Sequence, residues 1–137
     1  MRPPNTTRWA VYADHLGGYM RRWIIRTPFG DLRLHHILSS DRDGDLHDHP
    51  FDFTSLLLTG GYVEHTPQGS RFWPRFSVVR KKAEDAHRLE LVFPIWTLVF
   101  TRGYRRKWGF HTEKGWVYWR EYVSDAAWHG ERSGVPE

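Results

Sequence analysis

The segment 46–53 reads LHDHPFDF and places His47 and His49 two residues apart, directly before Pro50. In an extended strand, residues i and i+2 point to the same face, so the two imidazoles would lie on one side, close together. Two neutral imidazoles bind a divalent first-row metal ion well. Pro50 cannot donate to a β-ladder, which favours a bend directly after the pair. The spacing therefore predicts a metal site that needs a further ligand from elsewhere in the chain.

His87 is the best candidate for that third ligand. It lies in the segment EDAHRL at 84–89 and opens a run of residues typical of a strand. The neighbouring His35 and His36 would point to opposite faces of a strand, so one of them can face the interior and line a pocket.

The elements that must position these histidines are mostly strands. Runs rich in Val, Trp, Phe and Leu recur at a spacing typical of an all-β sandwich or barrel, at 9–12, 22–26, 32–38, 53–58, 62–65, 71–79, 87–93, 96–101 and 116–123. The connections are too short for crossover helices, which predicts antiparallel pairing. Thr59-Gly60-Gly61 indicates a hairpin between the fourth and fifth runs. Only residues 83–86 and 124–128 have a briefly helical pattern.

Composition limits the class of protein. The chain has 137 residues, of which 39% are apolar and 16% aromatic, which predicts one folded domain. Cysteine is absent, so a disulfide, a thiolate metal site and a cysteine nucleophile are excluded. We find no apolar run long enough for a signal peptide or a membrane span, and we expect a soluble cytoplasmic protein without a membrane partner. The net charge of +4 is too mild to indicate a nucleic acid partner, and no nucleic-acid motif is present.

Two stretches carry a family resemblance. The sequence GDLHDHP at 44–50, followed by Gly60-Gly61 after an apolar strand, resembles the first motif of the cupins. Ala86-His87-Arg88 resembles the histidine region of the second cupin motif, in a degenerate form.

The order of the motifs is also similar to that of small phage and bacterial cupin-like proteins. That pattern implies an HxHP element, a Gly-Gly-Tyr-x-Glu hairpin, a lone downstream histidine and a late Trp-Gly-Phe. In this chain they correspond to 47–50, 60–64, His87 and 108–110.

The resemblance extends over residues 32–122. It implies a single-domain, double-stranded β-helix (a jelly-roll barrel) with a metal in its mouth. We expect the barrel core at about 20–123, with flexible tails at 1–7 and 129–137. The resemblance also suggests a homodimer, although no residue here defines an interface.

One departure from the cupin pattern concerns the fourth ligand. Cupins place a glutamate four or five residues after the second histidine, where this chain has Phe53 and Thr54. Asp52 and Glu64 are the possible substitutes, and we prefer Glu64 because the expected hairpin would set it opposite Ser55. Residues opposite each other in a sheet have Cβ atoms about 4.5–5.5 Å apart. A site with three histidines only, and a barrel that has lost its metal, stay open as alternatives.

The aspartates before the histidine pair allow a calcium loop as a rival interpretation. Asp41, Asp43 and Asp45 alternate, and Asp52 falls at the last ligand position of an EF-hand. However, Leu46 occupies the position at which that loop requires glycine. We therefore expect a solvated loop whose aspartates help to orient the histidines.

The segment FTRGYRRKWGF at 100–110 mixes arginines with aromatic residues. An arginine can pair with a carboxylate or phosphate, and an aromatic ring can stack on the same ligand. We predict a substrate-binding wall formed by Arg102, Arg88, Trp108 and Tyr62. A solvated turn leading into core aromatics is the alternative for this segment.

These observations favour a metal-dependent cupin enzyme. The ion would be Fe, Mn, Ni or Zn, held by His47, His49, His87 and Glu64, since imidazole suits several of these metals. The resemblance implies oxygenase- or isomerase-type chemistry on a small organic substrate, of which an arginine of the wall could hold an anionic group. The sequence assigns no catalytic residue. Two other classes stay open: a non-catalytic cupin that binds a small ligand, and a basic accessory module that binds nucleic acid or protein.

Overall fold

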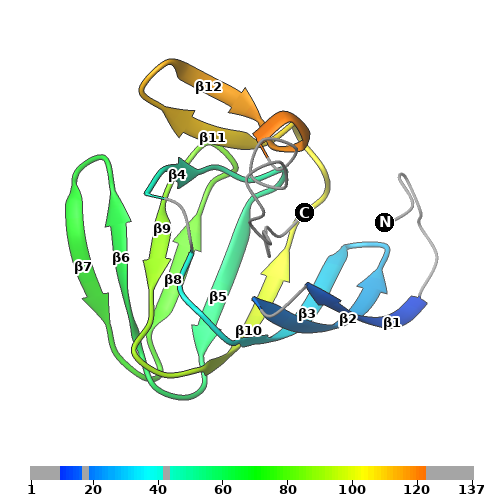
Figure 1. The fold of residues 1–137 in the computed structure, drawn as a ribbon. Coiled ribbons are helices and arrows are strands. Elements are labelled where there is room, and N and C mark those ends of the chain that lie inside the picture. The colour runs from blue at the N-terminus through cyan, green and yellow to red at the C-terminus, as the bar shows by residue number, and fades with distance from the viewer. Residues whose placement is uncertain (1–9, 17–18, 42–43, 123–137) are drawn as a thin grey trace.

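The computed structural model describes residues 10–16, 19–41 and 44–122, and these form two antiparallel walls around an interior cavity (Figure 1). The first wall has six strands in the order β1 (Ala10–Leu16), β2 (Met20–Thr27), β3 (Gly30–Ile37), β10 (Ile95–Thr101), β5 (Phe53–Leu57) and β8 (Val78–Lys81). All of its ladders are antiparallel, as the sequence predicts.

The second wall is built from two three-stranded sheets. One contains β12 (Gly115–Tyr118), β11 (Gly109–Thr112) and β4 (Leu46–His47), and the other contains β7 (Gly69–Trp73), β6 (Tyr62–Thr66) and β9 (Arg88–Glu90). An isolated antiparallel bridge between His47 and His87 joins the two sheets. A short helix follows β12 at 119–122. Within the described ranges, no helix has the length and apolar character needed to cross a membrane.

The predicted hairpin around Thr59-Gly60-Gly61 is wrong. Strand β5 pairs with β10 and β8 in the first wall, whereas β6 pairs with β7 and β9 in the second. Gly60 adopts a φ of 63°, and a Cβ added to Gly61 would lie 2.6 Å from the carbonyl oxygen of Trp73. The two glycines therefore carry the chain from one wall to the other instead of folding it back on itself.

Other boundaries also differ from the prediction. The expected strand at 71–79 is interrupted after Trp73, and Phe76 adopts a positive φ of 71° before β8 begins. Residues 83–86 form a turn rather than a helix. The helix expected at 124–128 and the tails expected at 1–7 and 129–137 lie outside the described residues.

The first wall has polar and charged side chains among its buried positions. In β10, Thr97, Val99 and Thr101 are buried while the larger residues between them are partly exposed, and in β2 Arg22 and Arg26 are buried while Trp23 is exposed. The apolar core contains Tyr19, Met20, Ile37, Leu57, Tyr62, Val79, Leu89 and Ile95, and several of these residues also line the cavity. The first wall therefore lines its interior with polar groups, which is where a binding cavity needs them.

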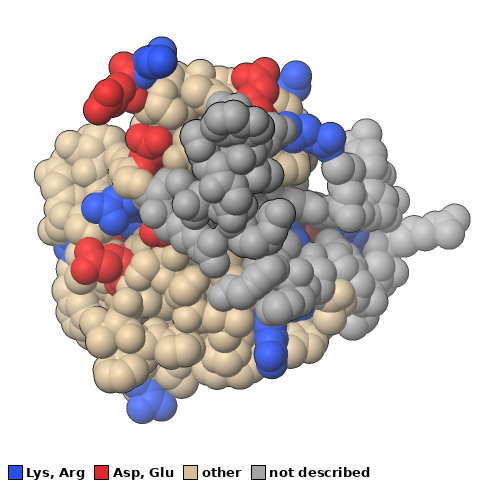
Figure 2. Space-filling view, in the orientation of Figure 1, with Lys and Arg blue, Asp and Glu red and all other residues tan. Residues whose placement is uncertain are grey.

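Acidic and basic side chains are interspersed on the face seen in Figure 2. Among the described residues on that face, neither sign forms a continuous patch, in keeping with the mild net charge of +4.

Candidate metal centre

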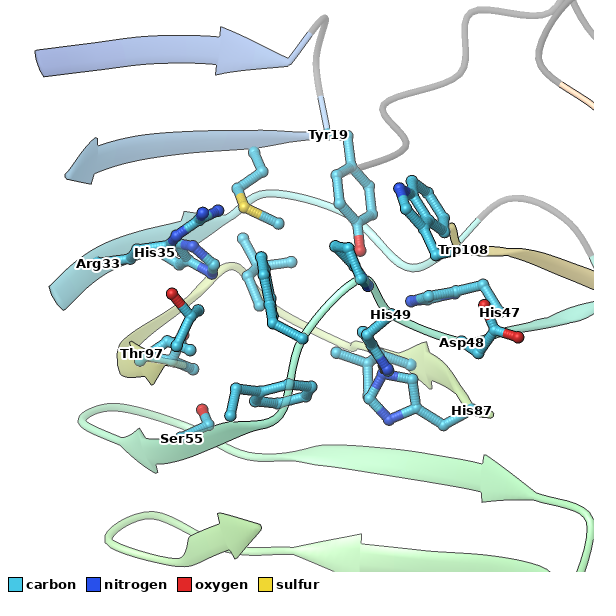
Figure 3. A pocket seen from close by; sticks show the side chains of 18 of the residues that line it. Tyr19, Arg33, His35, His47, Asp48, His49, Ser55, His87, Thr97 and Trp108 are labelled. Carbon is cyan, nitrogen blue, oxygen red and sulfur yellow. Dashed lines mark hydrogen bonds between the residues drawn. The ribbon is translucent and has the colours of Figure 1, made fainter. Parts of the chain in front are cut away.

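The backbone itself brings the three predicted histidines together. His47 and His87 form the bridge between the two sheets, with N···O distances of 2.8 and 2.9 Å. Directly opposed residues of an antiparallel bridge point to the same face. His49 lies two residues after His47, and its amide donates to the carbonyl of Ala83 at 2.9 Å. All three imidazoles therefore lie on one face of the second wall, buried at the cavity (Figure 3).

The distances fit a single bound metal ion. Each histidine offers one ring nitrogen such that these atoms all lie within 4.8 Å of one another. The Nε2 atoms of His49 and His87 are 3.2 Å apart. Two nitrogens that share one ion at about 2.1 Å are separated by about 3.0–3.4 Å when their angle at the ion is about 90–109°. The pair therefore already has the separation that coordination requires.

Burial keeps the imidazoles of His47 and His49 in the form that binds metal. It lowers the pKa of His47 to about 4, although the Asp41 carboxylate opposes the shift. Burial, and then the neighbouring His87 and His47, hold the pKa of His49 well below its usual value. Neutral imidazoles at pH 7 have a lone pair to donate, so neither ring must lose a proton before it binds a cation.

Glu64 lies behind the cluster rather than in it, which corrects the expectation that it is the fourth ligand. Its Oε2 accepts a hydrogen bond of 2.6 Å from Nδ1 of His87, the nitrogen opposite the one that faces His49. Lys81 Nζ lies 2.8 Å from the same oxygen, and Trp73 donates to Oε1 at 3.0 Å. The reason is that β6 pairs with β9, so Glu64 stands opposite Leu89, beside His87. The carboxylate fixes the tautomer of His87 and leaves Nε2 available.

A Glu64→Gln substitution should weaken metal binding about 10–100-fold, as is typical when a partner behind a histidine ligand is lost. The amide is nearly the same size, but it no longer holds a proton firmly on Nδ1 of His87. Isothermal titration of metal-free protein with Zn²⁺ measures this effect. A Glu90→Gln variant is the matched control, because Glu90 contacts the exposed His65 instead. Equal Zn²⁺ affinities in Glu64→Gln and Glu90→Gln would contradict the role of Glu64 in positioning His87.

The stability of the metal-free protein should fall in mild acid. Because the pKa of His47 is about 4 in the folded chain and near 6.5 in the unfolded chain, only the unfolded chain gains a proton between these values. The free energy of unfolding therefore decreases from pH 6.5 to 4, by on the order of 3 kcal/mol for this one group. Urea unfolding at pH 7.5, 5.5 and 4.5 measures the loss. A His47→Gln variant should lose less unfolding free energy over the same pH range. If the variant and the wild type lost stability equally with pH, His47 would not be the group responsible.

Two aspartates hold the histidine segment in place: Asp48, which the sequence did not single out, and Asp41, which it did. Asp48 is 1% exposed and accepts from the Gly109 amide at 2.7 Å, from Trp116 at 2.9 Å and from His111 at 3.0 Å. It thereby fastens the β11–β12 hairpin to the segment between the two ligands. Asp41 accepts from Tyr19 and from the Leu89 amide, each at 2.6 Å, and its Oδ2 lies 3.9 Å from Nδ1 of His47.

The calcium interpretation does not fit the described residues. Asp41 faces His47, as expected if the aspartates of this loop help to orient the histidines. Asp45 instead accepts a hydrogen bond from Tyr122 at 3.0 Å. Asp52 accepts from the Ala83 amide and pairs with Arg105. These carboxylates point to different partners, and Asp43 lies outside the described residues.

The cavity beside the histidines has a volume of about 90 Å³. Trp108 and Tyr62, both predicted to bind substrate, are buried and line the cavity. Of the neighbouring histidines His35 and His36, His35 is the one that lines it. His36 instead stacks on Trp96 on the outer face, with ring centroids 4.2 Å apart.

The two predicted substrate arginines lie elsewhere, which corrects the expected arginine wall. Arg102 is exposed and lines a separate surface hollow with Arg80 and Lys82. Arg88 stands in β9 opposite His65 and does not line the cavity. The arginine that lines the cavity is Arg33 of β3. One feature of the sequence could have indicated Arg33, because Arg33 and His35 alternate in a strand and therefore share a face.

Proteins of similar architecture occur among solved structures. No family model and no curated protein matches the chain. Among solved structures, Rru_A2000 from Rhodospirillum rubrum, a cupin-2 domain, is 15% identical, with a TM-score of 0.60 over 84% of this chain and 86% of that one. AerE from Microcystis aeruginosa is 14% identical, with a TM-score of 0.57 over 71% of this chain and 48% of that one. The Fe(II) form of HppE is 9% identical, with a TM-score of 0.50 over 61% of this chain and 50% of that one.

The chain spans about half the length of AerE and of HppE. At these identities the likeness concerns the fold, and it agrees with the two antiparallel walls and with the jelly-roll barrel predicted from the HxHP segment. The chain therefore has the cupin fold.

Proposed function

We propose that the protein is a metal-dependent cupin enzyme that acts on a small organic molecule. His47, His49 and His87 would hold one divalent ion, and the cavity beside them would receive the substrate. The observation that carries this proposal is the convergence of three buried imidazoles, two of them with strongly lowered pKa values, on the lining of one cavity.

The donor set favours a reactive site over a structural one. Structural zinc sites are closed by four protein ligands, whereas catalytic sites have three and keep a position open. Among the described residues, three histidines form the cluster and no carboxylate joins it. A bound Fe, Mn, Ni or Zn ion would supply Lewis-acid chemistry, and with Fe or Mn also redox chemistry.

The chain's own residues would confine the substrate. Phe53 packs against His49 with ring centroids 4.7 Å apart, and Trp108 lies 6.0 Å from His47. These rings restrict water at the histidines and leave one side of the cluster facing the cavity. The small volume selects for a compact substrate rather than for a polymer.

A coordination test distinguishes an enzyme from a protein with a closed structural site. Metal-free protein is loaded with Co²⁺, and its visible absorption is followed as azide is added. We expect one ion per chain and a spectral change that saturates with azide, because an open position exchanges its ligand. A spectrum that is insensitive to azide would show a closed site and would overturn the catalytic proposal. Failure to bind Co²⁺, Zn²⁺, Mn²⁺ or Fe²⁺ would overturn the metal site itself.

A further inference from the structure

The cavity has two chemically different ends (Figure 3). One end carries the three histidines. The first wall contributes polar side chains to the lining, and we call this set the polar end; it consists of Arg33, His35, Ser55, Thr97 and Thr101. Figure 3 shows Arg33, His35, Thr97 and Ser55 on the side opposite the histidine cluster.

The register of the first wall explains how the polar end forms. Thr97 stands opposite His35, and Val99 stands between Arg33 on one side and Ser55 on the other. Because alternate residues of a strand share a face, β3 and β10 both turn these side chains inward. Residues far apart in the sequence therefore present their polar atoms to one small volume.

Two atoms of the polar end point to a ligand. Thr101 is 1% exposed, and its Oγ1 has no hydrogen-bond partner among the described residues. The Nε2 atom of His35 is also buried and has no partner among them. A buried polar group without a partner costs about 1–3 kcal/mol, so such groups are uncommon unless something else satisfies them.

The charge at this end selects the kind of group that fits. Arg33 lies on the cavity lining, and its side chain is 2% exposed. Burial first, and then the positive charges of Arg33 and Arg22, hold the pKa of His35 well below its usual value. Arg33 and Arg26 share one buried carboxylate, that of Asp31, at 3.1 and 3.4 Å, so two guanidinium charges face one carboxylate charge. The polar end thus combines guanidinium charge with neutral groups that can donate hydrogen bonds, which favours an anionic acceptor and disfavours a cation.

We infer that the cavity takes a small carboxylic acid whose carboxylate lies at the polar end, with the reacting part of the molecule directed at the three histidines. This inference deepens the proposed function and names its substrate class. Met20, Ile37 and Val99 also line the cavity and supply apolar surface. A volume of about 90 Å³ restricts the acid to a short carbon skeleton.

Carboxylate binding can be measured without any metal. Metal-free, ¹⁵N-labelled protein in the presence of a chelator is titrated with acetate, propionate and butyrate, and separately with the matching amides. We expect the carboxylates to bind at least several-fold more tightly than the amides, with resonance shifts centred on β3 and β10. Shifts centred on the exposed hollow of Arg80 and Arg102, or equal binding of acids and amides, would overturn the inference.

Two variants and one control test the residues. His35→Leu should weaken butyrate binding about tenfold, and Thr101→Val several-fold, since each removes a hydrogen bond to a charged group. Thr101→Val preserves the side-chain shape and breaks no hydrogen bond within the described residues, so it should fold normally. His36→Leu is the matched control, because His36 lies next in sequence on the outer face. An unchanged affinity in both test variants would overturn the assignment.

The outcomes separate this inference from the metal proposal. Metal binding with no carboxylate binding, in either the metal-free or the Zn²⁺-loaded protein, would refute the substrate class and leave the metal site standing. Carboxylate binding that His35→Leu weakens, in a protein that binds no metal, would support the polar end and refute the enzyme.

Discussion

Replacing His49 by alanine is expected to abolish tight metal binding. The imidazole is buried, neutral at pH 7, and has its Nε2 3.2 Å from that of His87, so its loss removes one of the three available donors. Loss of a partner behind a ligand typically lowers metal affinity about 10–100-fold, and loss of a ligand itself should exceed that range. Elemental analysis after dialysis against Zn²⁺ should give one ion per wild-type chain and a background value for His49→Ala.

His65→Ala is the appropriate control for this substitution. His65 also lies on a strand of the second wall, but its ring is bonded to Ser70 and Glu90 on the surface. The control should retain the full equivalent of zinc. Equal zinc in His49→Ala and the wild type would mean that the cluster does not hold the ion.

Replacing Asp48 by alanine should give the largest loss of stability. This carboxylate is buried and serves the Gly109 amide, the Trp116 and His111 side chains and the Arg106 guanidinium, whose Nη1 lies 2.9 Å away. Its removal leaves the buried Gly109 amide without its side-chain acceptor and frees the β11–β12 hairpin. We expect the free energy of unfolding to fall by about 3 kcal/mol, measured by urea denaturation of metal-free protein.

Asp52→Ala is the control for Asp48. Asp52 also pairs with an arginine, but Asp52 and Arg105 are both more than a third exposed, so solvent screens the ion pair and it adds little to stability. Because Asp48 lies between His47 and His49, its loss should also weaken zinc binding, which Asp52→Ala should leave unchanged. A cost for Asp48→Ala no larger than that for Asp52→Ala would contradict its role in fixing the ligand segment.

The all-β architecture and the meeting of the three histidines were predictable because they rest on local rules. Strand alternation places His47 and His49 on one face, and the short connections between strands require antiparallel pairing. The motif order then indicated that His87 approaches them, and the His47–His87 bridge shows how it does so.

The contacts around the site depend on pairing that the sequence does not encode locally. Glu64 was expected to reach the site across a hairpin with β5, but Gly60 and Gly61 send β6 to the other wall, where it meets His87 from behind. The anchoring role of Asp48 could not be predicted from the sequence, because the main hydrogen-bond donors to its carboxylate lie 61 to 68 residues away.

The inward-facing arginines contradicted the usual expectation for strands. In β2 and β3 the buried positions include Arg22, Arg26 and Arg33, while Trp23 is exposed. A pattern of this kind looks inverted when hydrophobicity alone assigns the inner face. Arg102 was preferred as a ligand for a substrate because the segment 100–110 mixes arginines with aromatic residues. Such conflicts between local pattern and burial are expected at functional sites.

Anomalous diffraction from a crystal grown with Zn²⁺, recorded at the zinc absorption edge, is the most direct test of the metal centre. One peak is predicted, about 2.0–2.2 Å from a ring nitrogen of each of His47, His49 and His87, with the Glu64 carboxylate still bonded to Nδ1 of His87. A peak elsewhere on the chain, or three histidines in the positions described here with no zinc between them, would contradict the account.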